Sequence, residues 1–439
     1  MHRIFYTLLL FLAFQSSIFS TDCFNGRYKQ KIFQDVTITS DVKYAKLQRS
    51  DGAWLDYKYD VYQPKNDTAQ NRPLVVLAHG GAYLEIPLLD KKSPDIVELA
   101  LDLTQKGYVV ISIGYRLETN LLSLLSEENM IKAVGRAVMD ARLAFCRIVD
   151  TTLHYNNPYR IDLQSVFIGG VSAGTVSFLH GMFLDSISQM PNQYRQWIEQ
   201  VVPNAQQLLD DKFCGANILG MINVSGAVLD TAWIKPNRQY PALLSQHGTV
   251  DVAIPYSYGH PFGLPMLPNL MGSSLIDKRY KNLGLRSELE TWVNYNHVPF
   301  VGGLNLGALF GQNPLAVVFN PYVLDSTKRH ITNFCYSLLT CDALTTGIKQ
   351  HLMDSPISIF PNPSNGSFQI KIPFEAKYQN GTIDMYDISG KNVYQTNFPV
   401  FTENVFIDKH LPNGAYFIKL AYQKDEEEYI YTSKINIVH

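Results

Sequence analysis

The sequence predicts an α/β fold with a mostly parallel central sheet, followed by a small all-β sandwich. Two observations carry this prediction. Up to about residue 350, short apolar runs alternate with stretches of helical periodicity, as in a parallel sheet covered by helices on both faces. Beyond that point the helical periodicity is absent, and short alternating runs are separated by turn residues.

The first expected strand, Leu55 to Val61, alternates apolar and polar residues, which is typical of a strand near a sheet edge. Continuous apolar runs at Leu74 to Ala78 and Tyr108 to Ile113 predict strands that are buried on both faces. A helix is expected between them over 95–105, because Gly107 closes a helical stretch there.

Apolar residues at helical spacing from Met130 to Phe145 predict the next helix, and Val166 to Ile168 predicts the third buried strand. Further strands are expected at Met221 to Leu229, Ala242 to Gln246 and Leu289 to Tyr295. Ligands of parallel sheets bind at the carboxyl ends of the strands. Residues that carry chemistry are therefore expected directly after strands.

The C-terminal part is predicted to be a sandwich of short strands at Ser367 to Ile372, Gly381 to Tyr386, Val405 to Ile407, Ala415 to Tyr422 and Tyr429 to Ile437. The boundary between the two parts is expected between Asp342 and Ser355. We divide the chain into an α/β domain over 21–345, a linker over 346–355 and the sandwich over 356–439.

The N-terminus has the order of a secretory signal peptide, which we expect over 1–20. His2 and Arg3 precede the apolar stretch from Ile4 to Phe14, and a small residue follows at Ser20. The apolar stretch is too short to span a bilayer as a helix, and no other run approaches that length. The alternative is a buried N-terminal helix.

Charge and cysteine usage narrow the possible partners. Lys plus Arg (37) nearly balances Asp plus Glu (39), and no basic run is present, so nucleic acid is not an expected partner. The five cysteines lack C-x-x-C or interleaved His spacing, so no metal and no cofactor is expected. Cys335 and Cys341 form a candidate local disulfide, although the number is odd and connectivity cannot be read from spacing.

Gly170-Val171-Ser172-Ala173-Gly174 matches G-x-S-x-G and stands between the strand at Val166 to Ile168 and a helix expected from Thr175. The two glycines let the strand and the helix pass close to a sharp turn, which holds the serine exposed. The alternative is a glycine-rich turn with an incidental serine. A strand before the motif and a helix after it favour Ser172 as a nucleophile.

A serine hydroxyl is a weak nucleophile, so it needs a base and an acid that orients the base. With this motif the chain order is Ser, then Asp or Glu, then His. Asp251 follows the strand expected at Ala242 to Gln246 and is the expected acid, with Asp230 as its rival. His297 follows the last expected strand and is the expected base, ahead of His260 in a loop rich in Pro and Gly.

The segment Ala78 to Tyr83 follows the first buried strand and contains two adjacent glycines. Glycines there let backbone N–H groups approach a ligand oxygen. We expect Gly80, Gly81 and Ala173, the residue after the nucleophile, to form an oxyanion hole. The alternative is an ordinary glycine turn. His79 is expected to brace the loop rather than to act as a second base.

Taken together, His79-Gly80-Gly81, the G-x-S-x-G segment, His247-Gly248-Thr249-Val250-Asp251 and His297 resemble the motif set of a family of carboxylesterases. These are the hormone-sensitive-lipase and feruloyl-esterase-like branches of the α/β-hydrolase fold. The resemblance covers about residues 30–340 and departs at Ala82, where many relatives have a third glycine or a serine. It implies an α/β-hydrolase catalytic domain and a serine esterase that works through an acyl-serine intermediate.

The stretches Ile359 to Gly366, Asp387 to Lys391 and Leu411 to Phe417 resemble, in this order, a type IX secretion sorting domain. The resemblance implies contact with the type IX secretion machinery and passage through the periplasm. The protein would then be secreted or held at the cell surface. The alternative is a carbohydrate-binding sandwich.

These observations predict a secreted serine hydrolase that cleaves small-molecule or polymer-borne carboxylic esters. A lipase or a peptidase with the same triad is an alternative, because fold and triad do not fix the acyl group. A non-catalytic binding protein on the same fold is another. The apolar loop from Tyr256 to Leu270 is expected to form a pocket wall or a lid, or else to pack onto the core.

Overall fold

The structure is a computed structural model that describes residues 23, 26–210, 212–303, 318–339, 350–352, 357–373, 376, 380–400, 402–424 and 427–439. The chain divides into two compact units, Met1–Cys341 and Asp342–His439. The signal peptide predicted over 1–20 lies outside the described residues, as do parts of the linker predicted over 346–355.

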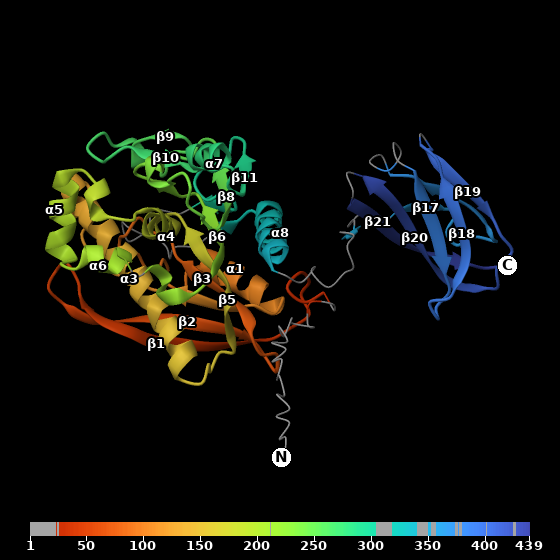
Figure 1. Cartoon of the computed structure of the whole chain (residues 1–439), viewed down its shortest axis with the longest axis horizontal. Coiled ribbons are helices and arrows are strands. Elements are labelled where there is room, and N and C mark those ends of the chain that lie inside the picture. The colour runs from red at the N-terminus through yellow and green to blue at the C-terminus, as the bar shows by residue number, and fades with distance from the viewer. Residues whose placement is uncertain are drawn as a thin grey trace, which may run out of the picture. The chain divides into compact units, whose positions relative to one another are not determined.

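The first unit is built on a large sheet with the strand order β1-β2-β4-β3-β5-β6-β8-β11 among the described residues (Figure 1). Its strands are β1 (Val36–Gln48), β2 (Trp54–Pro64), β3 (Arg72–Ala78), β4 (Val109–Ile113), β5 (Ile161–Val171), β6 (Ile218–Val224), β8 (Ala242–Gly248) and β11 (Ser287–Trp292). The strands from β4 to β11 in this order pair in parallel, and β2 pairs antiparallel with both β1 and β4. The sheet is therefore mostly parallel, as predicted.

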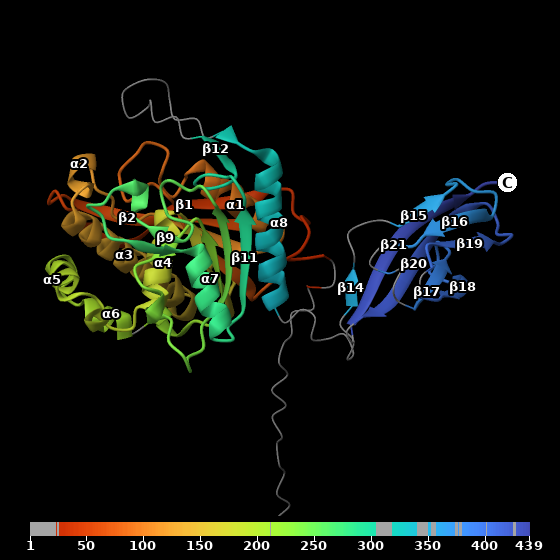
Figure 2. The ribbon, with the colours of Figure 1, turned by 90° about the horizontal axis from the view of Figure 1, so that it is seen from above.

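Helices cover both faces of this sheet. They are α1 (Pro94–Gln105), α2 (Leu121–Leu124), α3 (Glu127–His154), α4 (Ala173–Phe183), α5 (Asn192–Val201), α6 (Ala205–Asp210), α7 (Ser273–Asn282) and α8 (Pro321–Leu338). One apolar core lies between the sheet and α3, α4 and α7, and a second lies between the sheet and α1 and α8. Figure 2 shows α7 and α8 on opposite sides of β11. Strands β3 and β4 are wholly buried between these layers, which explains their continuous apolar sequence.

Short elements complete the first unit. They are β7 (Ala227–Val228), β9 (Tyr258–Gly259), β10 (Leu270–Gly272), β12 (Val301–Gly303), β13 (Val318–Phe319), η2 (Ile187–Gln189), η3 (Lys212–Gly215), η4 (Thr231–Trp233) and η5 (Pro261–Gly263). The order β7-β10-β9 makes a small separate sheet. The strand predicted over 221–229 is thus split into β6 and β7, because the chain turns at Ser225, which has a φ of 54°.

An insertion between α4 and β6 carries α5 and α6, which lie beside α3 (Figures 1 and 2). A disulfide between Cys146 on α3 and Cys214 in η3 ties the end of this insertion to the body of the unit. Cys23 is also disulfide-bonded, whereas Cys335 is a buried free thiol on α8. The expected pair of Cys335 and Cys341 is therefore wrong. Cys335 packs in the core beneath the sheet, where burial raises the pKa of its thiol.

The second unit is a sandwich of two sheets, with the orders β14-β21-β20-β17-β18 and β15-β16-β19. Its strands are β14 (Gln350–Leu352), β15 (Ser358–Phe360), β16 (Ser367–Lys371), β17 (Gly381–Tyr386), β18 (Asn392–Phe398), β19 (Asn404–Asp408), β20 (Gly414–Lys424) and β21 (Glu427–Ile437). Inward side chains of both sheets share one apolar core, with Ile370 from one sheet and Ile383 and Leu420 from the other. This is the all-β sandwich that the alternating runs predict.

Within the described residues, no helix has both the length and the apolar character that crossing a membrane requires. The same residues contain no cluster of His, Cys, Asp and Glu side chains suited to a metal ion.

Candidate active site

Ser172 lies at the turn between β5 and α4, in a backbone conformation that side chains rarely adopt. Its φ is 52° and its ψ is −122°, and its N–H donates to the carbonyl of Val224 at 2.8 Å. Such a conformation costs on the order of 1–3 kcal/mol and persists only where the surroundings impose it. The turn lifts the serine away from both the strand ladder and the helix.

The two glycines of the motif are required by close backbone packing. A Cβ on Gly170 would lie 2.1 Å from the Ala78 carbonyl oxygen, and a Cβ on Gly174 would lie 2.2 Å from the same oxygen. No side chain fits at either position. The end of β3 therefore passes directly against the turn that carries Ser172, as the G-x-S-x-G spacing requires.

The structure brings Ser172, His297 and Asp251 together from three separate segments. His297, in the loop after β11, has its Nε2 at 2.8 Å from the Ser172 Oγ and its Nδ1 at 2.7 Å from the Asp251 Oδ2. Because Nδ1–H donates to the carboxylate, Nε2 is left to accept a hydrogen bond from the serine hydroxyl. Asp251 is fully buried, and the His297 side chain is 18% exposed.

The Asp251 carboxylate is saturated with donors. Its Oδ1 accepts from the N–H groups of Ala253 at 2.8 Å and Ile254 at 2.9 Å, and its Oδ2 accepts from both His297 and His247. Burial opposes the charged form, but the hydrogen bonds from the two imidazoles outweigh it and hold the pKa of Asp251 well below its ordinary value. The residue is therefore a carboxylate at any pH near neutrality.

The loops that carry Asp251 and His297 are fastened to each other. The Asn296 Oδ1 accepts from Val252 N–H at 3.0 Å and from His297 N–H at 2.7 Å, so one side chain bridges both loops. A Cβ on Gly248 would lie 2.2 Å from the Tyr295 carbonyl oxygen, so only glycine permits the approach. These contacts set the distance between acid and imidazole.

A second histidine, His247, contacts Asp251, and the sequence analysis did not assign it this role. It is completely buried at the end of β8. Its Nε2 lies 3.0 Å from the Asp251 Oδ2 and 3.1 Å from the Ile254 carbonyl oxygen, and its Nδ1 lies 2.8 Å from the Ser273 Oγ. The spacing His247-x-x-x-Asp251 was visible, but its partner Ser273 lies on α7, which the sequence did not predict.

The glycine loop after β3 lies against Ser172. A Cβ on Gly80 would be 3.3 Å from the Ser172 Cβ, and Gly81 has a φ of 113°. Ala173 is the first residue of α4, where backbone N–H groups have no partner within the helix. Gly80 and Ala173 therefore lie next to Ser172, and Ala82 in the same loop has a left-handed φ of 52°.

His79 is built into the support of this loop. Its Nδ1–H donates to the Gly80 carbonyl oxygen at 2.7 Å, and its ring stacks on Tyr115 with centroids 4.4 Å apart. Burial lowers the pKa of His79 to about 4, so the ring stays neutral. Tyr115 also donates to the His79 carbonyl oxygen at 2.7 Å. These contacts agree with a bracing residue.

The two rival residues have other partners. Asp230 caps η4 by accepting from Ala232 N–H at 2.8 Å, and His260 Nδ1–H donates to the Leu267 carbonyl oxygen at 2.6 Å. Neither shares a hydrogen bond with Ser172 among the described contacts.

A pocket opens beside Ser172 and is bounded on one side by the loop that follows Asp251. Ile254, Pro261, Phe262, Pro268 and Leu270 form this side of the pocket. The loop predicted as a wall or lid over 256–270 is thus a wall in this structure.

Two family models match parts of the chain. Residues 59–211 match the model described as BD-FAE, and residues 358–437 match the one described as Secretion system C-terminal sorting domain. The first unit is an esterase-like α/β hydrolase. The sorting domain marks the chain for type IX secretion to the cell surface or the extracellular space.

Solved structures of esterases are among those to which the chain is similar. Thermogutta terrifontis esterase 2 phosphorylated by paraoxon is 14% identical, with a TM-score of 0.43, over 70% of this chain and 95% of that chain. The propionate-bound form of the esterase is 15% identical, with a TM-score of 0.43, over 71% and 97%. A truncated carbohydrate esterase from gut microbiota is 15% identical, with a TM-score of 0.40, over 69% and 96%. No curated protein matches the chain.

Proposed function

We propose that the esterase-like unit hydrolyses carboxylic esters through an acyl-serine intermediate, with Ser172 as nucleophile, His297 as general base and Asp251 as the orienting acid. The observation that carries this proposal is the unbroken hydrogen-bond chain from the Ser172 Oγ through His297 to Asp251. It supplies what a serine hydroxyl lacks by itself, namely a neutral base held in the tautomer that can accept its proton.

In the first half of the reaction the Ser172 Oγ attacks the ester carbonyl carbon as its proton passes to the His297 Nε2. The imidazolium that forms is stabilised by the buried carboxylate of Asp251, 2.7 Å from its Nδ1. Collapse of the tetrahedral intermediate breaks the carbon–oxygen bond to the alcohol, which takes the proton from His297. Ser172 is then acylated.

The negative oxygen of the tetrahedral intermediate is assigned to the backbone amides of Gly80, Gly81 and Ala173. Two observations support this assignment: Gly80 contacts Ser172, and Ala173 is the first residue of α4. Each such donor typically lowers the barrier by about 2.7–4 kcal/mol.

In the second half a water molecule takes the place of the alcohol. His297 removes its proton, the hydroxide attacks the acyl carbon, and the proton returns to the Ser172 Oγ as the acid leaves. His247 enters this cycle only through Asp251, because it donates to the carboxylate oxygen that also holds His297. It is a positioning residue.

The test is hydrolysis of p-nitrophenyl butyrate by the purified chain and by Ser172→Ala. We expect kcat to fall by about 10⁴-fold or more, because the triad acts as a unit. The matched control is Ser165→Ala, which removes a hydroxyl from the same strand, β5, away from the site. Activity of Ser172→Ala within tenfold of the parent would overturn the assignment of the nucleophile.

A further inference from the structure

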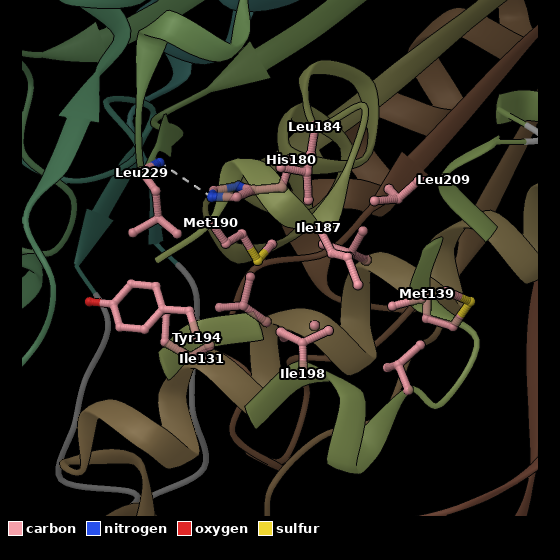
Figure 3. Close-up of a pocket in the computed structure, with 15 residues that line it drawn as sticks. Ile131, Met139, His180, Leu184, Ile187, Met190, Tyr194, Ile198, Leu209 and Leu229 are labelled. Carbon is pink, nitrogen blue, oxygen red and sulfur yellow. Dashed lines mark hydrogen bonds between the residues drawn. The ribbon is translucent and has the colours of Figure 1, made fainter. Parts of the chain in front are cut away.

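A second pocket lies behind the one that opens beside Ser172. The space within the first pocket is about 580 Å³ and that within the second about 540 Å³, and each value includes space that is open to solvent. Ile131, Val134, His180 and Leu229 line both, so the two pockets adjoin at these four side chains. Figure 3 shows the second pocket, with Ile131, His180 and Leu229 facing it.

The side chains around both pockets are almost entirely apolar, and the few polar ones have partners elsewhere. His180 Nδ1–H donates to the Val176 carbonyl oxygen at 2.8 Å, and its Nε2 accepts from Leu229 N–H at 3.3 Å, the bond drawn in Figure 3. Burial lowers the pKa of His180 to about 4, so the ring remains neutral. The Tyr194 hydroxyl donates to Glu127, and that of Tyr83 donates to the Ala173 carbonyl oxygen at 3.0 Å.

We infer that the two pockets together bind the acyl chain of an aliphatic ester, and that the enzyme prefers linear acyl chains of medium length over acetyl groups and hydroxylated aromatic acids. This inference rests on the proposed function, since it places the acyl carbon at Ser172. The first pocket takes the part of the chain next to the carbonyl, and the second takes its far end.

The position of His297 assigns this space to the acyl group and not to the alcohol. The leaving alcohol must lie within hydrogen-bond reach of His297 to receive its proton. His297 does not line either pocket, whereas Ala82, Ser172 and Ala173 line the first. The part of the ester that enters the pockets is therefore the part on the far side of the carbonyl from His297.

The absence of unsatisfied polar side chains around the described pockets selects an aliphatic chain. A phenolic acid would bury an oxygen there without a side-chain donor, because the hydroxyl protons of Tyr194 and Tyr83 and the ring N–H of His180 already donate elsewhere. A buried hydroxyl without a hydrogen bond costs about 1–3 kcal/mol as judged from protein variants, equivalent to a loss of about 5- to 150-fold. An acetyl group would leave most of this apolar space empty.

The insertion between α4 and β6 builds the far wall. Met190, Ile198, Val202, Ala205 and Leu209 line the second pocket from this insertion. The disulfide from Cys146 to Cys214 holds the end of the insertion against α3. Methionine side chains adapt their shape to an apolar ligand, and Met130, Met139 and Met190 contribute to the two pockets.

The experiment compares kcat/KM for p-nitrophenyl acetate, butyrate, octanoate, decanoate and palmitate. Each buried methylene contributes about 0.8 kcal/mol, or about fourfold. We expect butyrate to exceed acetate by about 15-fold, a further rise to octanoate or decanoate, and a fall at palmitate when the second pocket is full. A flat series, or a maximum at acetate, would overturn the inference.

A variant separates a ligand pocket from a loosely packed core. Ala205 lines only the second pocket, so Ala205→Phe fills that space without touching the first. We expect the ratio of kcat/KM for decanoate to kcat/KM for butyrate to fall to about one. The matched control is Ala216→Phe, in the same insertion but outside both pockets. An unchanged chain-length profile in Ala205→Phe, with folding verified by circular dichroism, would show that the second pocket holds no substrate.

Two further experiments distinguish failure of the inference from failure of the proposed function. In Ser172→Ala, decanoate binding measured by calorimetry reports on the pockets without catalysis, and absence of binding contradicts the inference. For acetate esters of alcohols of increasing length, we expect no comparable rise in kcat/KM. A rise found only in that series would show that the pockets bind the alcohol. Hydrolysis of acetate alone would leave the proposed function standing, whereas hydrolysis of no ester would remove it.

Discussion

Replacing Asp251 by asparagine tests the triad at the residue that accepts the most hydrogen bonds. The carboxylate accepts four hydrogen bonds, two from backbone amides on Oδ1 and two from imidazoles on Oδ2. Asparagine keeps one acceptor oxygen, which can serve Ala253 and Ile254, but its NH₂ group then faces His247 and His297. Both imidazoles must accept where they had donated.

The consequence for His297 is a change of tautomer. With its proton on Nε2, His297 faces the Ser172 hydroxyl as a donor and cannot accept its proton. We expect kcat to fall by about 10³–10⁴-fold with little change in KM, because the geometry is retained and only the proton acceptor is lost. Thermal stability should also fall, since a hydrogen bond to a charged group contributes about 1.5–3 kcal/mol.

The assay is steady-state hydrolysis of p-nitrophenyl butyrate, with Asp230→Asn as the matched control because the Asp230 side chain bonds only to the amide of Ala232 among the described contacts. The control should retain activity within about twofold. The reasoning is refuted if Asp251→Asn keeps kcat within tenfold of the parent, or if Asp230→Asn is the crippling change.

Three further predictions concern the second histidine, pH and secretion. His247→Phe keeps a ring at the buried site but removes one donor to Asp251, so kcat should fall about 10- to 100-fold and His247→Gln should restore part of it; equal activity of parent and Phe variant would contradict the positioning role. His79 and His180 have pKa values lowered to about 4 by burial, while the unfolded chain protonates them below about 6.5. Their stabilisation is complete above that pH and is lost as pH falls toward 4, so calorimetry should show a decreasing Tm over this range, and a constant Tm would contradict it. Deletion of residues 353–439 should leave an active enzyme in the periplasm of its host, and fractionation that finds it at the cell surface would contradict the sorting role.

The sequence predicted the sheet best where strands are buried on both faces. Runs such as Leu74 to Ala78 are apolar because both sides of the strand face helices. It did not predict β1, whose residues are mostly exposed and whose pairing with β2 shifts register twice, so that no clean alternation survives. The helices α5 and α6 are short, and α5 buries only Ile198 fully.

The residues of the candidate site were also predictable only in part. Ser172, Asp251 and His297 occur in the chain order typical of the motif, and each follows a strand. The order and the positions after strands can both be recognised in a sequence. Contacts between distant segments are not. The His247 contact with Ser273, the Asn296 bridge and the disulfide between Cys146 and Cys214 each depend on how separate segments meet in space.

The most direct test of the central claim is covalent capture of the nucleophile. The purified chain is treated with the diethyl phosphate ester paraoxon, which phosphorylates an activated serine as p-nitrophenolate leaves, and the modified peptide is located by mass spectrometry. The account predicts one adduct per chain on Ser172, none on Ser172→Ala, and much slower labelling of His297→Ala. A stable adduct on another residue, with Ser172 unmodified in a chain that hydrolyses p-nitrophenyl butyrate, would contradict it.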